Sequence, residues 1–357
     1  MIPVTKPFLP PKEEYLKLID DIYSSCTLTN QGPKVQLFEE EVKSLLHLKN
    51  FQYVTNGTVA LQLALRALGV SSGEVITTPF SYVATVSAVL WERCKPVFAD
   101  VEPERLTIDP KKIEEKISPN TKAILGVHVF GHPCKVDEID EISQKYGIPV
   151  IYDAAHAFGV KKAGRSIFDW GDVSTCSFHA TKLLHTIEGG GCICQTDSLA
   201  SQIDLIKRFG HNADNHLCLG INAKQSEFHA SMGICNLEHF SEILEKRKRL
   251  SKKYDQLLSG KLKIFSAEED VEYNYAYYPV IFPDEKVLLR VLRALRDQEI
   301  FARRYFYPSL NTLPYLAETN SCPISEDISL RILCLPLYYD LEGEDVERIC
   351  SAINREL

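Results

Sequence analysis

The chain alternates short apolar runs with longer segments of helical character, and this alternation constrains its fold most strongly. Most of the short runs are followed at once by a small or polar residue. The predicted strands span residues 51–54, 74–77, 96–99, 123–129, 148–152, 176–178 and 191–195. In open α/β sheets, ligands bind beyond the carboxyl ends of parallel strands. We therefore predict an α/β fold in which helices flank a mostly parallel central sheet, with a site at that edge.

The length of 357 residues is sufficient for two structural units. Residues 1–240 are predicted to form a large domain, and residues 241–357 a smaller C-terminal α+β domain. A helix over residues 236–256 joins them. In the small domain we expect strands at 275–282 and 332–335 around a helix at 285–298. Residues 1–12, which contain four prolines, are expected to run extended over the surface or over a partner subunit.

Charge and composition exclude several classes of partner. The net charge of −8 argues against nucleic acid, because binding to phosphate backbones needs clustered Lys and Arg. The eleven cysteines include no CxxC pair, so we expect reduced thiols and no metal site. No apolar stretch reaches the roughly 18 residues of a membrane span, and the N-terminus lacks the apolar core of a signal peptide. We expect a cytoplasmic protein without a membrane partner.

Asn56, Gly57 and Thr58 stand between a predicted strand and a predicted helix. Glycine permits a tight turn there, and the start of the helix offers free backbone N–H groups. Together with the Thr58 hydroxyl, these groups form a candidate phosphate site. A plain strand–helix turn with a capping threonine explains the pattern equally well.

Two other residues are candidates for chemistry. Asp153 follows an apolar strand, so its carboxylate could hold a nitrogen heterocycle in the protonated state. Lys182 lies in a loop that begins after Ser177 and ends at a run of three glycines. A lysine in a confined site can have a lowered pKa and attack an aldehyde. The alternatives are a capping aspartate and an exposed loop lysine, and His156 alone is explained equally well as a structural histidine.

Taken in chain order, these residues resemble the cofactor site of fold-type-I transferases that depend on pyridoxal 5′-phosphate (PLP). Tyr82 adds an aromatic residue about two dozen positions after Thr58. SFHATKLLHTIEGGG and DAAHAFG are similar to motifs of the DegT/DnrJ/EryC1/StrS family of sugar-nucleotide aminotransferases. The resemblance covers essentially the whole chain and includes TPFSYVATVSAVLWERCKPVFADVEPERLTID, VHVFGHPCKVDEI and GINAKQSEFHASMGICNL.

The resemblance implies a role for each of these residues. Lys182 would hold PLP as a Schiff base and carry the proton during the transfer. Asp153 would pair with the pyridine nitrogen, Tyr82 would stack on the ring, and His156 would contact the ring hydroxyl. The phosphate would be held by Gly57, Thr58, Ser177 and, reaching across from a partner subunit, Asn222. Each site would then be built by two chains of a homodimer.

The implied reaction moves an amino group from L-glutamate, which leaves as 2-oxoglutarate, to a keto sugar nucleotide, with pyridoxamine 5′-phosphate as the intermediate form of the cofactor. VTKPFLPP, LTNQGP and TTPFSYVATVSAVLWE most resemble the branch that converts dTDP-4-keto-6-deoxy-D-glucose to dTDP-4-amino-4,6-dideoxy-D-glucose for O-antigen or other surface glycans. The expected substrate contacts are Thr29, Asn30, Lys207, His211 and Tyr307. For Lys207 and His211, a solvated basic surface explains the pattern equally well.

Several other functions share this scaffold. A 3-keto sugar nucleotide could be the acceptor, and an epimerase or lyase remains an alternative. Dehydrating relatives that use pyridoxamine 5′-phosphate carry His in place of the cofactor lysine, so Lys182 favours transamination over dehydration. A non-catalytic regulator is disfavoured, because no helix-turn-helix segment or basic recognition helix is apparent.

Overall fold

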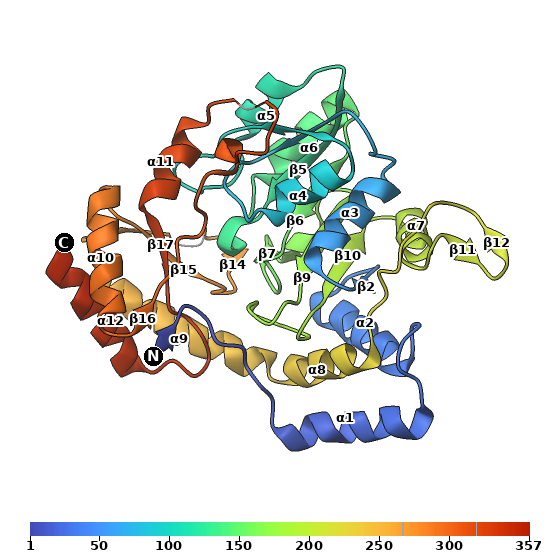
Figure 1. Cartoon of the computed structure of the whole chain (residues 1–357), viewed down its shortest axis with the longest axis horizontal. Helices are drawn as coiled ribbons and strands as arrows, with labels where there is room; N and C mark the ends of the chain where they lie inside the picture. Colours follow the sequence, from blue (N-terminus) through green and yellow to red (C-terminus); the bar gives the residue numbers. More distant parts are fainter. Residues whose placement is uncertain (266–267, 319) are drawn as a thin grey trace.

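The computed structural model describes residues 1–265, 268–318 and 320–357. Its centre is a seven-stranded sheet with the strand order β2-β10-β9-β6-β5-β3-β4 (Figure 1). The strands are β2 (Gln52–Val54), β3 (Glu74–Thr77), β4 (Lys95–Phe98), β5 (Thr121–Val127), β6 (Val150–Asp153), β9 (Val173–Ser177) and β10 (Gly190–Cys194). Within this sheet only β10 runs antiparallel to its neighbours. The predicted α/β fold with a mostly parallel sheet is confirmed.

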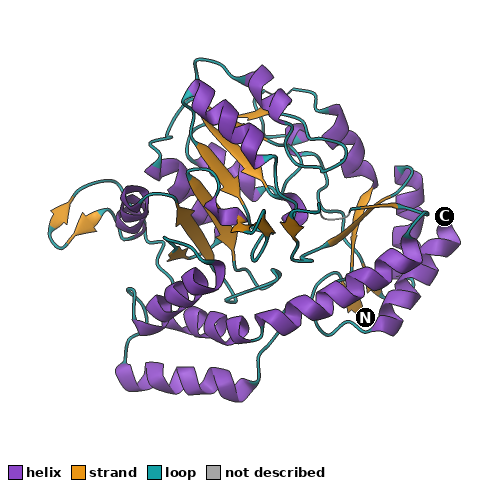
Figure 2. Ribbon diagram, turned by 180° about the vertical axis from the view of Figure 1, so that it is seen from behind, coloured by secondary structure: helices purple, strands orange, loops and turns teal. Residues whose placement is uncertain are grey.

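Helices cover both faces of the sheet (Figure 2). The helices of residues 1–240, the predicted large domain, are α1 (Lys12–Ser25), α2 (Pro33–Leu46), α3 (Gly57–Ala67), α4 (Ala84–Trp91), α5 (Pro110–Lys116), α6 (Val136–Tyr146), α7 (Asp197–Lys207) and α8 (Glu227–Glu238). Alternate strand residues enter two separate cores. In β6, Val150 and Tyr152 pack in the core that contains residues of α2, α6 and α8, whereas Ile151 packs in the core of α3, α4 and α7. Burial on both faces explains why the strands are continuous apolar runs.

The C-terminal part of the chain, which the sequence predicts to be a small domain, contains a three-stranded antiparallel sheet in the order β13-β15-β17. Its elements are α9 (Phe240–Leu258), β13 (Lys263–Ile264), β15 (Tyr278–Ile281), α10 (Glu285–Arg296), β16 (Ile300–Phe301), α11 (Pro323–Arg331), β17 (Ile332–Leu335) and α12 (Gly343–Glu356). The single helix predicted over 236–256 is instead two helices that meet at His239, whose ring is hydrogen-bonded by Glu14 and Glu242. Figure 2 shows α9 running from the large domain into the small one.

Short strands complete the structure. The hairpin of β11 (His211–Asn212) and β12 (Asn215–His216) projects beyond α7 (Figure 1). β7 (Lys161–Lys162), β8 (Arg165–Ser166) and β14 (Val271–Glu272) form a small separate sheet. No helix in the described residues is long and apolar enough to cross a membrane.

The N-terminal segment is extended, as expected, but its first residues pack on the small domain rather than on the large one. β1 (Ile2–Pro3) pairs in parallel with β16, and the Val4 carbonyl accepts a hydrogen bond from the Leu337 N–H at 3.1 Å. The physical reason is that Ile2 is buried in the small-domain core, while Pro3, which lacks an N–H, is tolerated at a sheet edge. Further along, the Phe8 carbonyl accepts a hydrogen bond from His185 Nε2 at 2.6 Å.

Candidate active site

A cavity of about 890 Å³ opens at the carboxyl ends of β5, β6 and β9. Large-domain residues form its floor and one wall, and the small domain supplies Tyr277, Arg303, Tyr305 and Phe306. The lining includes seven of the residues singled out in the sequence, namely Gly57, Thr58, Tyr82, Asp153, His156, Ser177 and Lys182. These residues span 126 positions of the chain and meet because parallel strands end at one edge.

Asp153 ends β6 and lies at the base of the cavity, where only 7% of its surface is exposed. Its carboxylate accepts hydrogen bonds from Thr85 Oγ1 at 2.9 Å and from the Ala155 N–H at 3.2 Å. Burial raises the pKa of Asp153, and these two hydrogen bonds and the charge of Lys182 oppose that rise. An ionised carboxylate that is buried in this way favours a cationic partner, such as a protonated pyridine nitrogen.

Lys182 lies in the loop between β9 and β10, where its N–H donates to the His179 carbonyl at 2.8 Å. Its Nζ is 3.5 Å from the Tyr277 hydroxyl. Burial lowers the pKa of Lys182 to about 8, although the nearby Asp153 and Tyr82 act in the opposite direction. The amine therefore has a neutral, nucleophilic fraction at neutral pH.

His156 lies beside Asp153 and is buried. Its ring is nearly parallel to that of Phe306, with centroids 5.7 Å apart. The Phe130 N–H donates to His156 Nδ1 at 3.2 Å, and burial lowers the pKa of the imidazole well below its usual value. A neutral ring whose Nδ1 accepts a hydrogen bond carries its proton on Nε2. His156 can therefore donate to a ring oxygen of a ligand.

The start of α3 forms an anion cradle. Asn56 caps the helix by accepting a hydrogen bond from the Val59 N–H at 2.9 Å. The first N–H groups of a helix have no partners within it, and the helix dipole favours an anion beside them. A side chain at Gly57 would place its Cβ 3.0 Å from the Ser177 Cβ. Glycine therefore allows β9 to bring the Ser177 hydroxyl to this helix end.

The donor set fits PLP, a planar cationic ring with a phosphate, a phenolic oxygen and an aldehyde. The cradle at Gly57 and Ser177 suits the phosphate, and the buried Asp153 suits the ring nitrogen. Tyr82, 52% exposed and lining the cavity, offers a free aromatic face. The amine of Lys182 suits the aldehyde.

None of the five predicted substrate contacts lines this cavity, and one of these predictions is wrong. Lys207 is fully buried, and its Nζ is 2.7 Å from Gln52 Oε1 and 3.4 Å from Glu39 Oε1. Its ammonium group is held inside the large domain and cannot reach a substrate. The other four are Thr29, Asn30, His211 and Tyr307.

Asn222 was expected to reach a phosphate in another subunit. It is exposed and pairs through its backbone with Arg208, outside the lining of this chain's own cavity. That position is compatible with a contact to a second chain.

Arg303 and Arg304 are adjacent basic residues that the sequence does not distinguish, but their side chains have different surroundings in the structure. Arg304 pairs with Glu285 at 2.8 Å and stacks on Tyr307. Arg303 instead lines the cavity, where its guanidinium lies 4.8 Å from the Tyr305 ring centroid. Adjacent residues of an extended segment point to opposite sides, so alternation along 301–307 is the signal that could have distinguished them.

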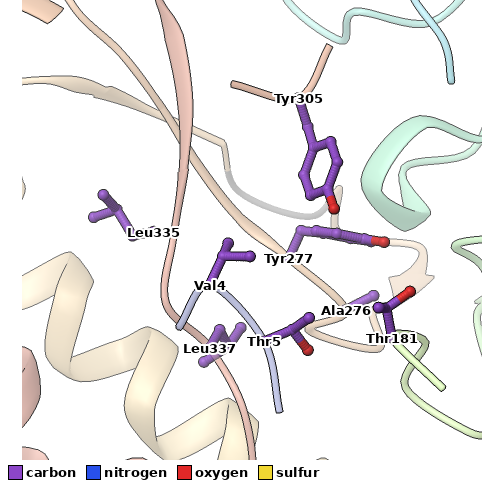
Figure 3. A pocket seen from close by; sticks show the side chains of 8 residues that line it. All are labelled: Val4, Thr5, Thr181, Ala276, Tyr277, Tyr305, Leu335 and Leu337. Carbon is purple, nitrogen blue, oxygen red and sulfur yellow. The ribbon is translucent and has the colours of Figure 1, made fainter. Parts of the chain in front are cut away.

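A second, very small cavity lies between the N-terminal segment, the loop that carries Lys182 and the small domain (Figure 3). N-terminal residues Val4 and Thr5 border it together with Thr181, which precedes Lys182. Tyr277 and Tyr305 border both cavities. The N-terminal segment, the lysine loop and the small domain therefore meet beside the candidate site.

Comparison with known proteins agrees with this geometry. The DegT/DnrJ/EryC1/StrS aminotransferase family matches residues 11–354. The chain is 39% identical over 359 residues to the dTDP-4-amino-4,6-dideoxy-D-glucose transaminase of Shigella dysenteriae, covering 98% of this chain and 97% of that protein. It is 32% identical over 358 residues to the GDP-perosamine synthase of Escherichia coli O157:H7, covering 99% and 98% of the two chains.

Among solved structures, that of DesI with its TDP-sugar product is similar, with a TM-score of 0.94 and 30% identity over 99% of this chain and 92% of that one. The predicted family and fold type are confirmed. The chain belongs to the DegT/DnrJ/EryC1/StrS aminotransferase family, whose cofactor is PLP.

Proposed function

We propose that this protein transfers the amino group of L-glutamate to C4 of dTDP-4-keto-6-deoxy-D-glucose and forms dTDP-4-amino-4,6-dideoxy-D-glucose. The observation that carries the aminotransferase assignment is the convergence of Lys182, Asp153 and the Gly57 cradle in one cavity. The 39% identity to a transaminase of that amino sugar, over nearly the whole of both chains, supports the choice of sugar.

Each residue has a part in this chemistry. PLP, when bound, supplies the electron sink for removal of a proton at the substrate carbon. Asp153 holds the ring nitrogen protonated, and His156 donates to the ring oxygen. Lys182 accepts the proton from glutamate at its Nζ and delivers a proton to the sugar carbon.

Arg303 is proposed to bind the anionic part of both substrates. The two substrates, a dicarboxylate and a sugar nucleotide diphosphate, are anions. Arg303 is exposed on the small-domain wall of the cavity and forms no ion pair within the part of the chain that the structure describes. A planar guanidinium binds carboxylate and phosphate equally well through paired hydrogen bonds.

The test is a panel of keto sugar nucleotides incubated with the PLP-loaded enzyme and L-glutamate, with products identified by NMR. We expect an amine at C4 of the dTDP sugar and one 2-oxoglutarate for each amino sugar. An amine at C3 would identify the 3-keto alternative, and a deoxygenated sugar without nitrogen would identify a dehydratase. The Lys182→Ala variant is the matched control for non-enzymatic amination.

We also propose a homodimer in which Asn222 reaches the phosphate cradle of the other subunit. The support is the exposure of Asn222 and of apolar residues around it, which are Phe209, Leu217, Leu219 and Ile221. Asn222→Ala should weaken PLP binding without changing the sedimentation coefficient. A monomer that binds PLP at full affinity would contradict this arrangement.

A further inference from the structure

Two buried hydroxyl groups stand behind the Asp153 carboxylate. Thr85, in the first turn of α4, donates from Oγ1 to Asp153 Oδ2 at 2.9 Å. The Oγ atom of Ser81 lies 2.7 Å from the same Thr85 oxygen. Thr85 is fully buried, so solvent does not compete for its hydroxyl, and Ser81, which borders the cavity, is only 2% exposed.

Counting protons fixes the direction of both hydrogen bonds. An ionised carboxylate only accepts, so the single O–H of Thr85 points to Asp153. Ser81 must therefore donate to the Thr85 oxygen. The result is a chain from Ser81 through Thr85 to Asp153, in which each hydrogen bond polarises the next.

These contacts fix the carboxylate from two different elements. Thr85 holds Oδ2 from α4, while the Ala155 N–H holds Oδ1 at 3.2 Å from the segment after β6. Two contacts on opposite oxygens prevent rotation of the carboxylate plane. Hydrogen bonds to the charged form also offset the cost of burying that charge.

The same turn also positions the aromatic ring of the site. The Thr85 N–H donates to the Tyr82 carbonyl at 3.1 Å, and the Tyr82 ring lines the cavity. The residues before and within the first turn of α4 thus position both the Tyr82 ring and the hydroxyl that holds the Asp153 carboxylate.

We propose that Thr85 is a positioning residue that aims the Asp153 carboxylate at the ring nitrogen of PLP, with Ser81 as the donor behind it. The proposal rests on the function proposed for Asp153 above. Its chemical consequence is that loss of the Thr85 hydroxyl makes Asp153 more basic and less well oriented, so that the ring nitrogen is less fully protonated.

The test compares Thr85→Val, which keeps the shape and removes the hydroxyl, with Thr85→Ser, which restores a hydroxyl. Each variant is loaded with PLP labelled with ¹⁵N in the ring, and the ¹⁵N chemical shift is recorded. The matched control is Thr77→Val, because Thr77 is also fully buried but its hydroxyl donates to the Leu125 carbonyl at 2.8 Å.

We expect Thr85→Val to move the ¹⁵N signal toward that of unprotonated pyridine and to lower kcat by about ten- to one-hundred-fold, with KM changed less than about two-fold. Thr85→Ser and Thr77→Val should keep the wild-type signal. Ser81→Ala should cause a smaller shift in the same direction, and it tests the chain if Thr85→Val does not fold.

Three results would overturn the proposal. The first is an unchanged ¹⁵N signal in Thr85→Val, and the second is a loss of activity that Thr85→Ser does not restore. The third is a further loss when Thr85→Val is added to Asp153→Asn. If Asp153→Asn itself were nearly fully active, the function proposed for Asp153 would fail together with this inference. A normal Thr85→Val beside an inactive Asp153→Asn would overturn this inference alone.

Discussion

The Nζ atom of Lys182 lies 3.5 Å from the hydroxyl oxygen of Tyr277, across the boundary between the two domains. Burial raises the pKa of Tyr277, so its hydroxyl stays neutral and adds no charge beside the amine. The distance is at the long limit of a hydrogen bond, which leaves the amine free to react. The small domain therefore helps to enclose the Nζ atom of Lys182 without holding it in a strong hydrogen bond.

Replacing Lys182 by Ala should lower turnover by at least about three orders of magnitude, because it removes the group that carries the proton. PLP and pyridoxamine 5′-phosphate should still bind through the cradle at Gly57 and through Asp153. The measurement is the rate of 2-oxoglutarate release in single-turnover experiments. Lys49→Ala, a change in an exposed lysine paired with Asp197, is the control. Near-normal turnover of Lys182→Ala would remove the residue from its role.

Uptake of PLP by the apoenzyme should accelerate with pH around a midpoint near 8. Only the neutral amine attacks an aldehyde, and burial lowers the pKa of Lys182 to about 8. Raising the pH through this value deprotonates the amine, so the rate rises and then reaches a plateau. An ordinary lysine would give a midpoint of about 10.4. Stopped-flow absorbance of apoenzyme mixed with PLP between pH 6 and pH 10 measures the midpoint, and a value near 10 would contradict the burial effect.

The neighbouring arginines should behave differently when each is replaced by Gln. Arg303→Gln should raise KM for the sugar nucleotide or for L-glutamate by about ten-fold or more, because a charge-assisted hydrogen bond to the substrate is lost. Its melting temperature should not change. Arg304→Gln should lower the melting temperature and leave KM unaltered, because Arg304 pairs with Glu285 and with backbone carbonyls. If Arg303→Gln and Arg304→Gln changed KM equally, the proposal that Arg303 binds the substrates would be wrong.

Lys207→Met should reduce the free energy of unfolding by about 3–5 kcal/mol, because it leaves the buried Glu39 without its cation. Urea unfolding measures the change, and the double variant Lys207→Met, Glu39→Gln should recover part of it. The KM values should stay at the wild-type level. An altered KM with unchanged stability would instead favour the substrate contact that the structure contradicts.

The sequence alone predicted every strand of the central sheet, although not the residue at which each strand begins and ends. Strands that are buried on both faces appear in the sequence as continuous apolar runs, and the small or polar residues that follow the parallel strands mark the ligand edge. Lys182, Asp153 and Gly57 were only weak candidates by themselves, and the resemblance of the motifs around them to those of a known family singled them out, because a motif is a local property of the chain. Their convergence in one cavity then follows from the parallel order of the sheet.

Tertiary structure decided what depends on contacts between distant segments. Lys207 and Arg303 are both basic residues in the sequence, yet one is paired inside the domain and the other faces the cavity, because burial depends on which elements pack around each side chain. The pairing of β1 with β16 joins residues nearly 300 positions apart. Thr85 gave no sign in the sequence of supporting Asp153, 68 positions later. This hydrogen bond depends on how the segment around Thr85 packs against the end of the strand that carries Asp153. The sequence around either residue contains no sign of that packing.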